Sequence, residues 1–202
     1  GAPSVGFLPT GKPLLEEIIS KLIVMLKSAK HKEFINFIIE DSARYKRFIE
    51  DISPALQVEG YAYFDLSSPE EAFKKIVTKA AEQDKLKSVT EDFVTEMASV
   101  FNEDESGSSD GQSVSVERSD FLIALADYLE EFTNVIPSII DLTNCHESPF
   151  IERLYRLKER GRMLLLGDRG KERVEIQNLS EEESKIYINS VLTPLVDDDE
   201  LC

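Results

Sequence analysis

The 202-residue sequence contains no tryptophan, two cysteines and two histidines. Cys145 and Cys202 form neither the paired framework of a disulfide-stabilised protein nor a CxxC motif. With His31 and His146 as the imidazoles, a four-ligand zinc site would need carboxylates in most positions, an unusual ligand set for that ion. The sequence therefore predicts no metal site and no cofactor. It also indicates a reducing compartment, the cytoplasm or the nucleus.

Long apolar runs are missing as well. No stretch approaches the ~20 consecutive apolar residues that a membrane-spanning helix needs. The start of the sequence, GAPSVGFLPTGKP, lacks the basic and then apolar layout of a signal peptide. We therefore expect no association with a membrane.

The sequence contains no familiar catalytic motif. The patterns GxxxxGK[ST], GxGxxG, GxSxG and HExxH do not occur. In the run Asn144-Cys145-His146-Glu147 a thiol stands beside an imidazole, but adjacency in sequence does not hold a nucleophile and its base in hydrogen-bonding geometry. Carboxylates are too numerous for an acid/base pair to be chosen from the sequence. We predict no catalytic residue.

Basic residues are scarce relative to acidic ones. The chain has 23 Lys and Arg against 39 Asp and Glu, a formal net charge of -16. This balance argues against nucleic acid or anionic lipid as the partner, because both require clustered positive charge. The exception is the stretch 153–173, which holds eight basic and three acidic residues. We predict a partner-binding surface there, consisting of Arg160, Arg162, Arg169, Lys171 and Arg173.

The sequence is rich in the periodicity of α-helices. The longest strongly apolar helical pattern spans residues 120–142, and its apolar positions reach most of the way round the helix. A helix of this kind must be surrounded, so we expect it at the centre of the fold. Pro137 predicts a kink or a break near residues 133–136.

Shorter helical patterns accompany this central one. Residues 14–28, 34–39 and 45–52 predict three helices in tandem, the last ending at Pro54, and residues 55–67 predict an ordered loop or a short strand. Further helix starts are indicated at Ser68, Ser88, Ser148 and Ser180. The predicted fold class is therefore predominantly all-α, either a multi-helix bundle or an armadillo-like or HEAT-like helical domain.

The region after the central helix is different in character. The runs RMLLL and KERVEIQ flank a Gly-Asp-Arg-Gly turn, which predicts either a small β-hairpin or a continued helix. With a helix on each side, a hairpin here would give residues 148–193 the layout of a winged helix, which binds nucleic acid.

The domain organisation follows from these patterns. Residues 1–12 predict an irregular lead-in, and residues 13–202 predict a single helical domain. Within it, residues 102–119 are rich in Ser, Gly and acidic side chains, which is typical of a flexible loop. The loop is either a solvated insertion or a phosphorylated switch around Ser106, Ser108 and Ser109.

Together, these features predict a non-catalytic adaptor or scaffold domain of a larger intracellular eukaryotic assembly. It would bind another protein or a peptide through a helical groove and charged patches. Two alternatives stay open. One is an enzyme subunit whose site is made of dispersed carboxylates and arginines, and the other is a winged-helix-like nucleic-acid binder that uses residues 148–193.

Overall fold

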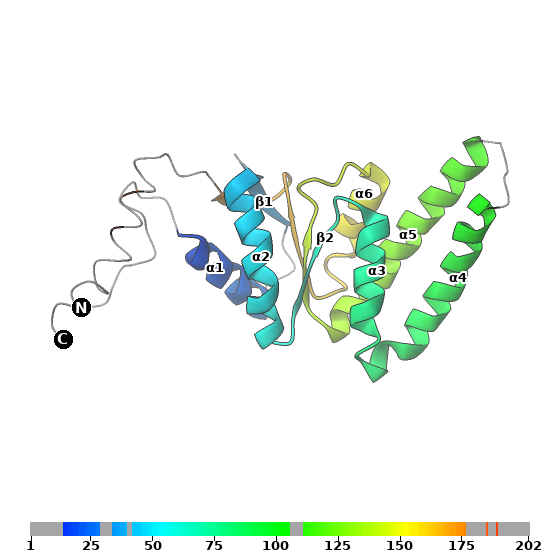
Figure 1. The fold of residues 1–202 in the computed structure, drawn as a ribbon, viewed down its shortest axis with the longest axis horizontal. Helices are drawn as coiled ribbons and strands as arrows, with labels where there is room; N and C mark the ends of the chain where they lie inside the picture. The colour runs from blue at the N-terminus through cyan, green and yellow to red at the C-terminus, as the bar shows by residue number, and fades with distance from the viewer. Residues whose placement is uncertain are drawn as a thin grey trace.

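The computed structural model describes residues 14–28, 34–39, 42–105 and 111–176, together with the single residues 185 and 189; the side chains of residues 99–105 and 111–117 lie outside the description. A five-stranded, all-parallel sheet lies between two layers of helices (Figure 1). The strands are β1 (Phe34–Ile39), β2 (Ala62–Asp65), β3 (Ser138–Asp141), β4 (Met163–Gly167) and β5 (Glu172–Ile176). Their order in the sheet is β2-β3-β4-β1-β5.

The helices divide between the two faces of the sheet. They are α1 (Leu15–Lys27), α2 (Ser42–Val58), α3 (Pro69–Ala80), α4 (Lys87–Glu105), α5 (Gly111–Val135) and α6 (Ser148–Leu157), with a short 3-10 helix, η1 (Asp84–Leu86), before α4. The first layer, α1 and α2, packs on side chains such as Ile35 and Leu164. The second layer, α3 to α6, packs on the other face, where Leu165 is buried. Successive side chains of a strand point to opposite faces, so Leu164 and Leu165 serve separate cores.

The predicted all-α fold class is wrong, because the protein is an α/β fold with a parallel sheet. Residues 34–39, expected to be helical, form the interior strand β1, and the 55–67 region contributes β2 rather than only a loop. Strands buried on both faces read as continuous apolar runs without alternation. FINFII and MLLLG are such runs, and over so few residues periodicity does not separate a strand from a buried helix.

The expected central helix exists, but it ends earlier than the apolar pattern does. Leu125, Leu129 and Phe132 of α5 have no exposed surface, whereas Ile123, also part of the apolar pattern, is 42% exposed. The helix is therefore deeply buried on one side but is not surrounded. The helix stops at Val135, and the chain continues as β3 after Pro137. Proline disfavours helical geometry at the residue before it, so the predicted break became a change from helix to strand.

The other local predictions have mixed outcomes. At the start of α3 the Ser68 hydroxyl accepts a hydrogen bond from the Glu71 amide at 3.4 Å, so this predicted cap is confirmed. By contrast, α2 runs through Pro54 to Val58, where an end was expected. Helix α4 begins at Lys87 and α6 at Ser148, so Ser88 and Ser148 lie inside the first turns instead of capping them. The helix expected after Ser180 lies outside the described residues.

The segment between β4 and β5 is a crossover and not a hairpin. Both strands pair with β1 in the parallel direction, one on each side, so residues 168–171 carry the chain across β1. Gly170 makes this passage possible, because a Cβ atom there would lie 1.9 Å from the Phe34 carbonyl oxygen and 2.3 Å from the Asn36 nitrogen. The hairpin that a winged helix requires is therefore not formed.

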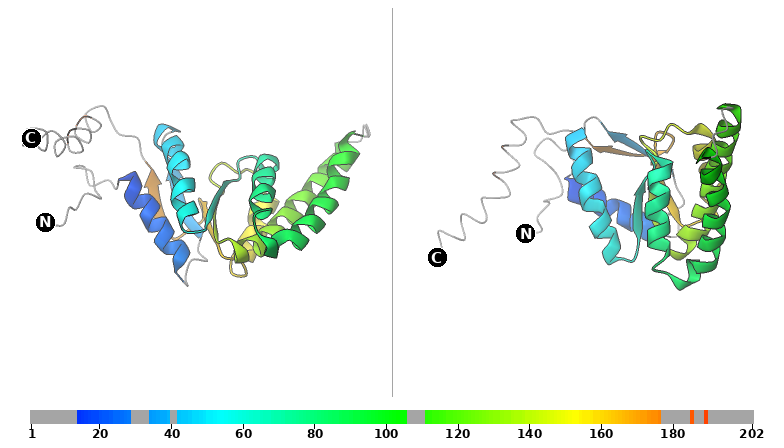
Figure 2. Two further views of the ribbon diagram at one scale, coloured as in Figure 1. Left: turned by 60° about the horizontal axis from the view of Figure 1, so that its bottom comes forward. Right: turned by 45° about the vertical axis from the view of Figure 1, so that its right-hand side comes forward.

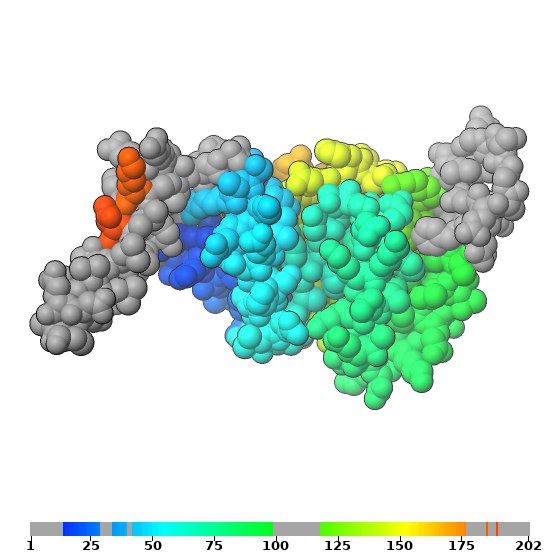
Figure 3. Space-filling view, in the orientation of Figure 1, coloured from blue at the N-terminus to red at the C-terminus, as the bar shows by residue number. Residues whose placement is uncertain are grey.

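Helices α4 and α5 form a pair that extends beyond the sheet (Figure 2). They occupy residues 102–105 and 111–119 of the segment expected to be a flexible loop, and residues 106–110, with Ser106, Ser108 and Ser109, lie outside the description. In the space-filling view α2 and α3 form much of the visible surface (Figure 3). None of the helices in the described part of the chain is long and apolar enough to cross a membrane.

Candidate functional site

The chain leaves β1 and β3 toward opposite faces of the sheet. After β1 it enters α2 in the first layer, whereas after β3 it enters α6 in the second layer, and β4 lies between these two strands. In open α/β sheets the crevice outside the carboxyl ends of the strands, where the direction of winding reverses, is the usual place for a ligand. The carboxyl edge around β1, β4 and β3 is therefore the candidate site.

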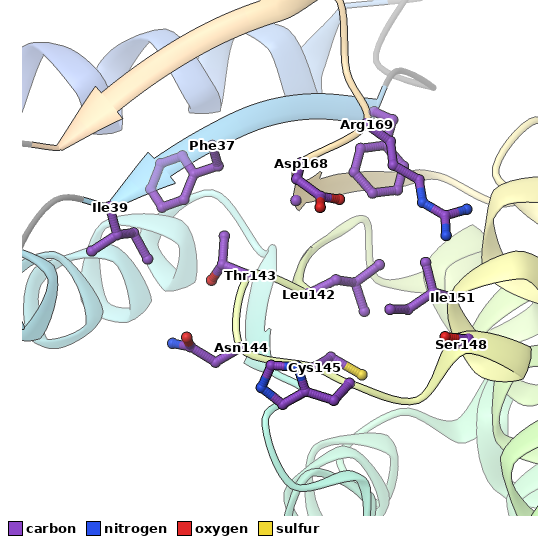
Figure 4. Close-up of a pocket in the computed structure, with 13 residues that line it drawn as sticks. Phe37, Ile39, Leu142, Thr143, Asn144, Cys145, Ser148, Ile151, Asp168 and Arg169 are labelled. Carbon is purple, nitrogen blue, oxygen red and sulfur yellow. The ribbon is translucent and has the colours of Figure 1, made fainter.

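A hollow of about 430 Å³ lies at this position, and we call it the first hollow. Apolar side chains from β1, the end of β3 and α6 line it together with polar side chains from the β3–α6 loop and from the crossover (Figure 4). The lining consists of Phe34, Phe37, Ile39, Leu142, Thr143, Asn144, Cys145, His146, Ser148, Ile151, Gly167, Asp168 and Arg169. Its size lies within the range of small-ligand pockets, about 300–1,000 Å³.

A second hollow, of about 510 Å³, adjoins the first. It lies between the C-terminal half of α6 and the crossover, and it is lined by Phe34, Tyr155, Lys158, Arg169, Gly170, Lys171 and Glu172. Phe34 and Arg169 belong to both linings, so they form the wall that the two hollows share. We call the combined lining of the two hollows the crossover surface.

The second hollow is open because the second layer of helices does not extend over it. The core beneath that layer includes Phe34 of β1 and no residue of β5 among its buried members. The helix nearest to this corner is α6, whose Tyr155 is 44% exposed. The crossover and α6 therefore frame a recess over the start of β1.

Positive charge dominates the second hollow, with three cationic side chains against the carboxylate of Glu172. Arg169 is paired with Glu152 of α6, and the Lys158 Nζ lies 3.9 Å from a Glu159 carboxylate oxygen. Lys171 is exposed, and no ion pair joins it to another residue of the described chain. This hollow thus offers a cation whose charge the described part of the protein does not neutralise by pairing.

The nearby carboxylate of Asp141 is closed off from both hollows. Asp141 ends β3 and is fully buried. The Tyr45 and Tyr63 hydroxyls donate to its Oδ2 at 2.6 and 2.5 Å, and the Thr143 amide and hydroxyl donate to its Oδ1. We call these four residues the Asp141 cluster. A carboxylate has about four acceptor sites, so these four hydrogen bonds occupy all of them.

Burial raises the pKa of Asp141, while the hydrogen bonds from Thr143, Tyr45 and Tyr63 oppose this shift by stabilising the ionised form. Burial also raises the pKa of both tyrosines, and the Asp141 charge adds to the effect. The two hydroxyls therefore stay protonated and remain donors. This carboxylate acts as an internal acceptor, and it has no acceptor site left for a ligand or a metal ion.

The thiol and imidazole that stand together in the sequence lie on the β3–α6 loop. Cys145 is buried, and burial raises the pKa of its thiol, which disfavours the nucleophilic thiolate. His146 is exposed at the rim of the first hollow. Within the described residues no group of three or more His, Cys, Asp or Glu side chains could hold a metal ion.

The five predicted partner-binding residues do not form one patch. Arg169 and Lys171 lie in the second hollow, as part of the crossover surface. Arg173 lies on β5 and pairs with Glu175 at 2.5 Å. Arg160 and Arg162 precede β4, so they lie at the amino edge of the sheet, at the opposite end of that strand from Arg169.

Several residues of the crossover surface were not predicted from the sequence. In the sequence, Tyr155 reads as an apolar position of a short helix and Lys158 as one of the basic residues of the stretch 153–173. Phe34 and Phe37 read as apolar positions of a helix. One feature of the sequence indicated the site: Thr143 and Asn144 are polar residues that follow β3. Polar residues just after the carboxyl end of a parallel strand often line a ligand site. This indication depends on recognising β3 as a strand.

Comparisons of the chain with protein-family models, with curated proteins and with solved structures found no match.

Proposed function

We propose that this chain is a non-catalytic interaction domain that binds a segment of a partner protein along the crossover surface. The observation that carries the proposal is the pair of adjoining hollows that share Phe34 and Arg169. Two recesses side by side suit alternate side chains of an extended segment, because side chains two residues apart point to the same side. The free thiol of Cys145 fits a reducing compartment, and we place the domain in the cytoplasm or the nucleus.

The state of Asp141 favours binding over catalysis. In an α/β fold a carboxylate at the carboxyl end of a strand is a natural candidate for acid/base chemistry or metal ligation. Here Tyr45, Tyr63 and Thr143 take up all of its acceptor sites. The groups that remain open toward solvent are aromatic, amide, hydroxyl and cationic side chains, together with the His146 imidazole and the Asp168 and Glu172 carboxylates. All of them can serve recognition of a partner segment.

Selection from a library of random displayed peptides tests this proposal. A blocked variant, Ser148→Trp with Lys171→Trp, places an indole at an exposed position in each hollow. A matched control, Asp84→Trp with Lys85→Trp, adds two indoles at exposed positions on η1. We expect peptides selected on the unmodified chain to bind the control and to lose affinity for the blocked variant. Selection of no peptide, or equal binding to the blocked variant, would contradict the proposal.

A further inference from the structure

We infer that the partner segment is acidic: a glutamate or aspartate side chain occupies the second hollow, next to an apolar side chain in the first hollow. This inference rests on the proposed function, and it adds the chemistry of the partner. It follows from the cations of the second hollow, from the fixed position of two of them and from the apolar side chains in the lining of the first hollow.

The charge argument is local. The chain as a whole carries -16, so its general field repels an acidic segment. Any affinity for carboxylates must therefore come from a site where cations are gathered. The second hollow gathers three cations, Lys158, Arg169 and Lys171. Glu159 and Glu152 lie beside the first two, and Lys21 lies 3.7 Å from the lining carboxylate of Glu172. Lys171 is therefore the cation that a ligand carboxylate can pair with.

Two of the cations are held in place before a ligand arrives. The Lys158 Nζ lies 5.3 Å from the centre of the Tyr155 ring, which is a cation–π distance. The Tyr155 ring in turn lies 5.9 Å from the Phe34 ring, and Arg169 is fixed by its pair with Glu152. Ordering these side chains in advance lowers the entropy that binding would otherwise cost.

The geometry of the crossover supplies the third cation. Gly170 lies directly on the backbone of β1, so the short crossover has little freedom to move away from the strand. Lys171 follows it and is exposed, without an ion pair to another described residue. A carboxylate beside Lys171 would supply the ion pair that this side chain lacks among the described residues.

The first hollow supplies the neighbouring subsite. Phe37, Leu142 and Ile151 come from three different elements and line it, and Phe34 forms the wall toward the second hollow. An apolar side chain that enters it removes apolar surface from water, at about 25 cal/mol per Å². An acidic residue two positions from an apolar one in an extended segment therefore matches the two hollows.

Fluorescence anisotropy with the full chain tests the inference. The probes are three labelled peptides with a central phenylalanine. Two residues away on each side they carry glutamate, glutamine or phosphoserine, because those positions point to the same side as the phenylalanine in an extended segment. The two variants are Lys171→Glu and, as a matched control, Lys85→Glu on η1, which is exposed and changes the net charge by the same amount.

We expect the glutamate peptide to bind the unmodified chain about tenfold more tightly than the glutamine peptide, because exposed charge pairs contribute up to about 1 kcal/mol each. Lys171→Glu should weaken the glutamate peptide about fivefold or more and leave the glutamine peptide unchanged. Lys85→Glu should behave as the unmodified chain does.

Three results would overturn the inference: no binding of the glutamate peptide, equal binding of the glutamate and glutamine peptides, or binding of the phosphoserine peptide alone. The proposed function is judged separately by the peptide selection. Selected peptides that lose affinity for the blocked variant but carry no acidic residues would preserve the function and reject the acidic partner.

Discussion

The Asp141 cluster and the crossover surface are neighbouring polar regions, and they differ in where their partners come from. Asp141 is fully buried, and its acceptors are occupied by Tyr45, Tyr63 and Thr143. Lys171 is exposed, with no ion pair inside the described chain. The difference teaches that polar groups here divide into those satisfied by the fold, which stabilise it, and those left for an external partner.

The most disruptive change to the crossover surface is Gly170→Ala. The new Cβ would collide with backbone atoms of Phe34 and Asn36, which cannot rotate away as a side chain can. We expect a loss of more than about 4 kcal/mol in the free energy of unfolding, measured by urea denaturation.

The control for this change is Gly60→Ala. Gly60 has φ of 75° and no atom within 4 Å of the added Cβ, so only backbone strain of about 1 kcal/mol is expected. Equal stability losses in the two variants would show that the crossover does not press on β1.

Removing the central acceptor tests the Asp141 cluster. Asp141→Ala leaves the Tyr45 and Tyr63 hydroxyls and the Thr143 amide without their acceptor in a buried site, which should cost about 3 kcal/mol or more. Asp65→Ala is the matched control, because Asp65 pairs with Asp141 in the sheet register and accepts from the Ser67 amide near the surface. Its expected cost is about 1 kcal/mol in the same denaturation experiment. A cost for Asp141→Ala as small as for Asp65→Ala would mean that the cluster is not structural.

Stability at alkaline pH tests the two tyrosines of the Asp141 cluster. Burial raises the pKa of Tyr45 and Tyr63 above the ordinary value of 10.0. Above pH 10 the unfolded chain therefore binds fewer of these protons than the folded chain, so the stability that these groups contribute is complete below pH 10 and is lost as the pH rises.

We expect the free energy of unfolding to fall above pH 10 by up to about 1.4 kcal/mol per pH unit for each tyrosine. The double variant Tyr45→Phe with Tyr63→Phe should show a shallower decline, whereas Tyr155→Phe should follow the unmodified protein. If the free energy of unfolding of the double variant fell with pH as steeply as that of the unmodified protein, the two tyrosines would not be buried donors to Asp141.

The smallest effect on stability is expected at the crossover surface. Lys171→Glu should change the free energy of unfolding by less than about 1 kcal/mol, because the side chain is exposed. Arg173→Glu removes the pair with Glu175 and should also cost about 1 kcal/mol or less. Differential scanning calorimetry at low and high salt would show a large destabilisation if these cations instead held the fold together.

The sequence revealed helices more readily than strands, for a physical reason. The helical pattern of α5 and the Ser68 cap were predictable, because the helical periodicity and the cap each show within a few residues of sequence. The strands β1 and β4 depend on partners far away in the chain, as the register Phe34 with Leu165 shows. A short apolar run does not indicate which strand it will pair with.

The candidate site was predictable only in part, for the same reason. Arg169 and Lys171 stood out as basic residues beside glycines, and both lie in the second hollow. Arg160 and Arg162 belong to the same basic stretch of the sequence. They lie at the other end of β4, because that strand stands between them and Arg169. That the Gly170 turn crosses β1 could not be seen without the sheet order.

Amide hydrogen exchange of the full chain, with and without a saturating peptide from the display selection, tests the central claim most directly. We predict that added protection is concentrated in residues 142–148 and 168–172, the two loops of the crossover surface, with the amides of α1 and α2 unchanged. Protection on α1 and α2 with none in these two loops would contradict the account.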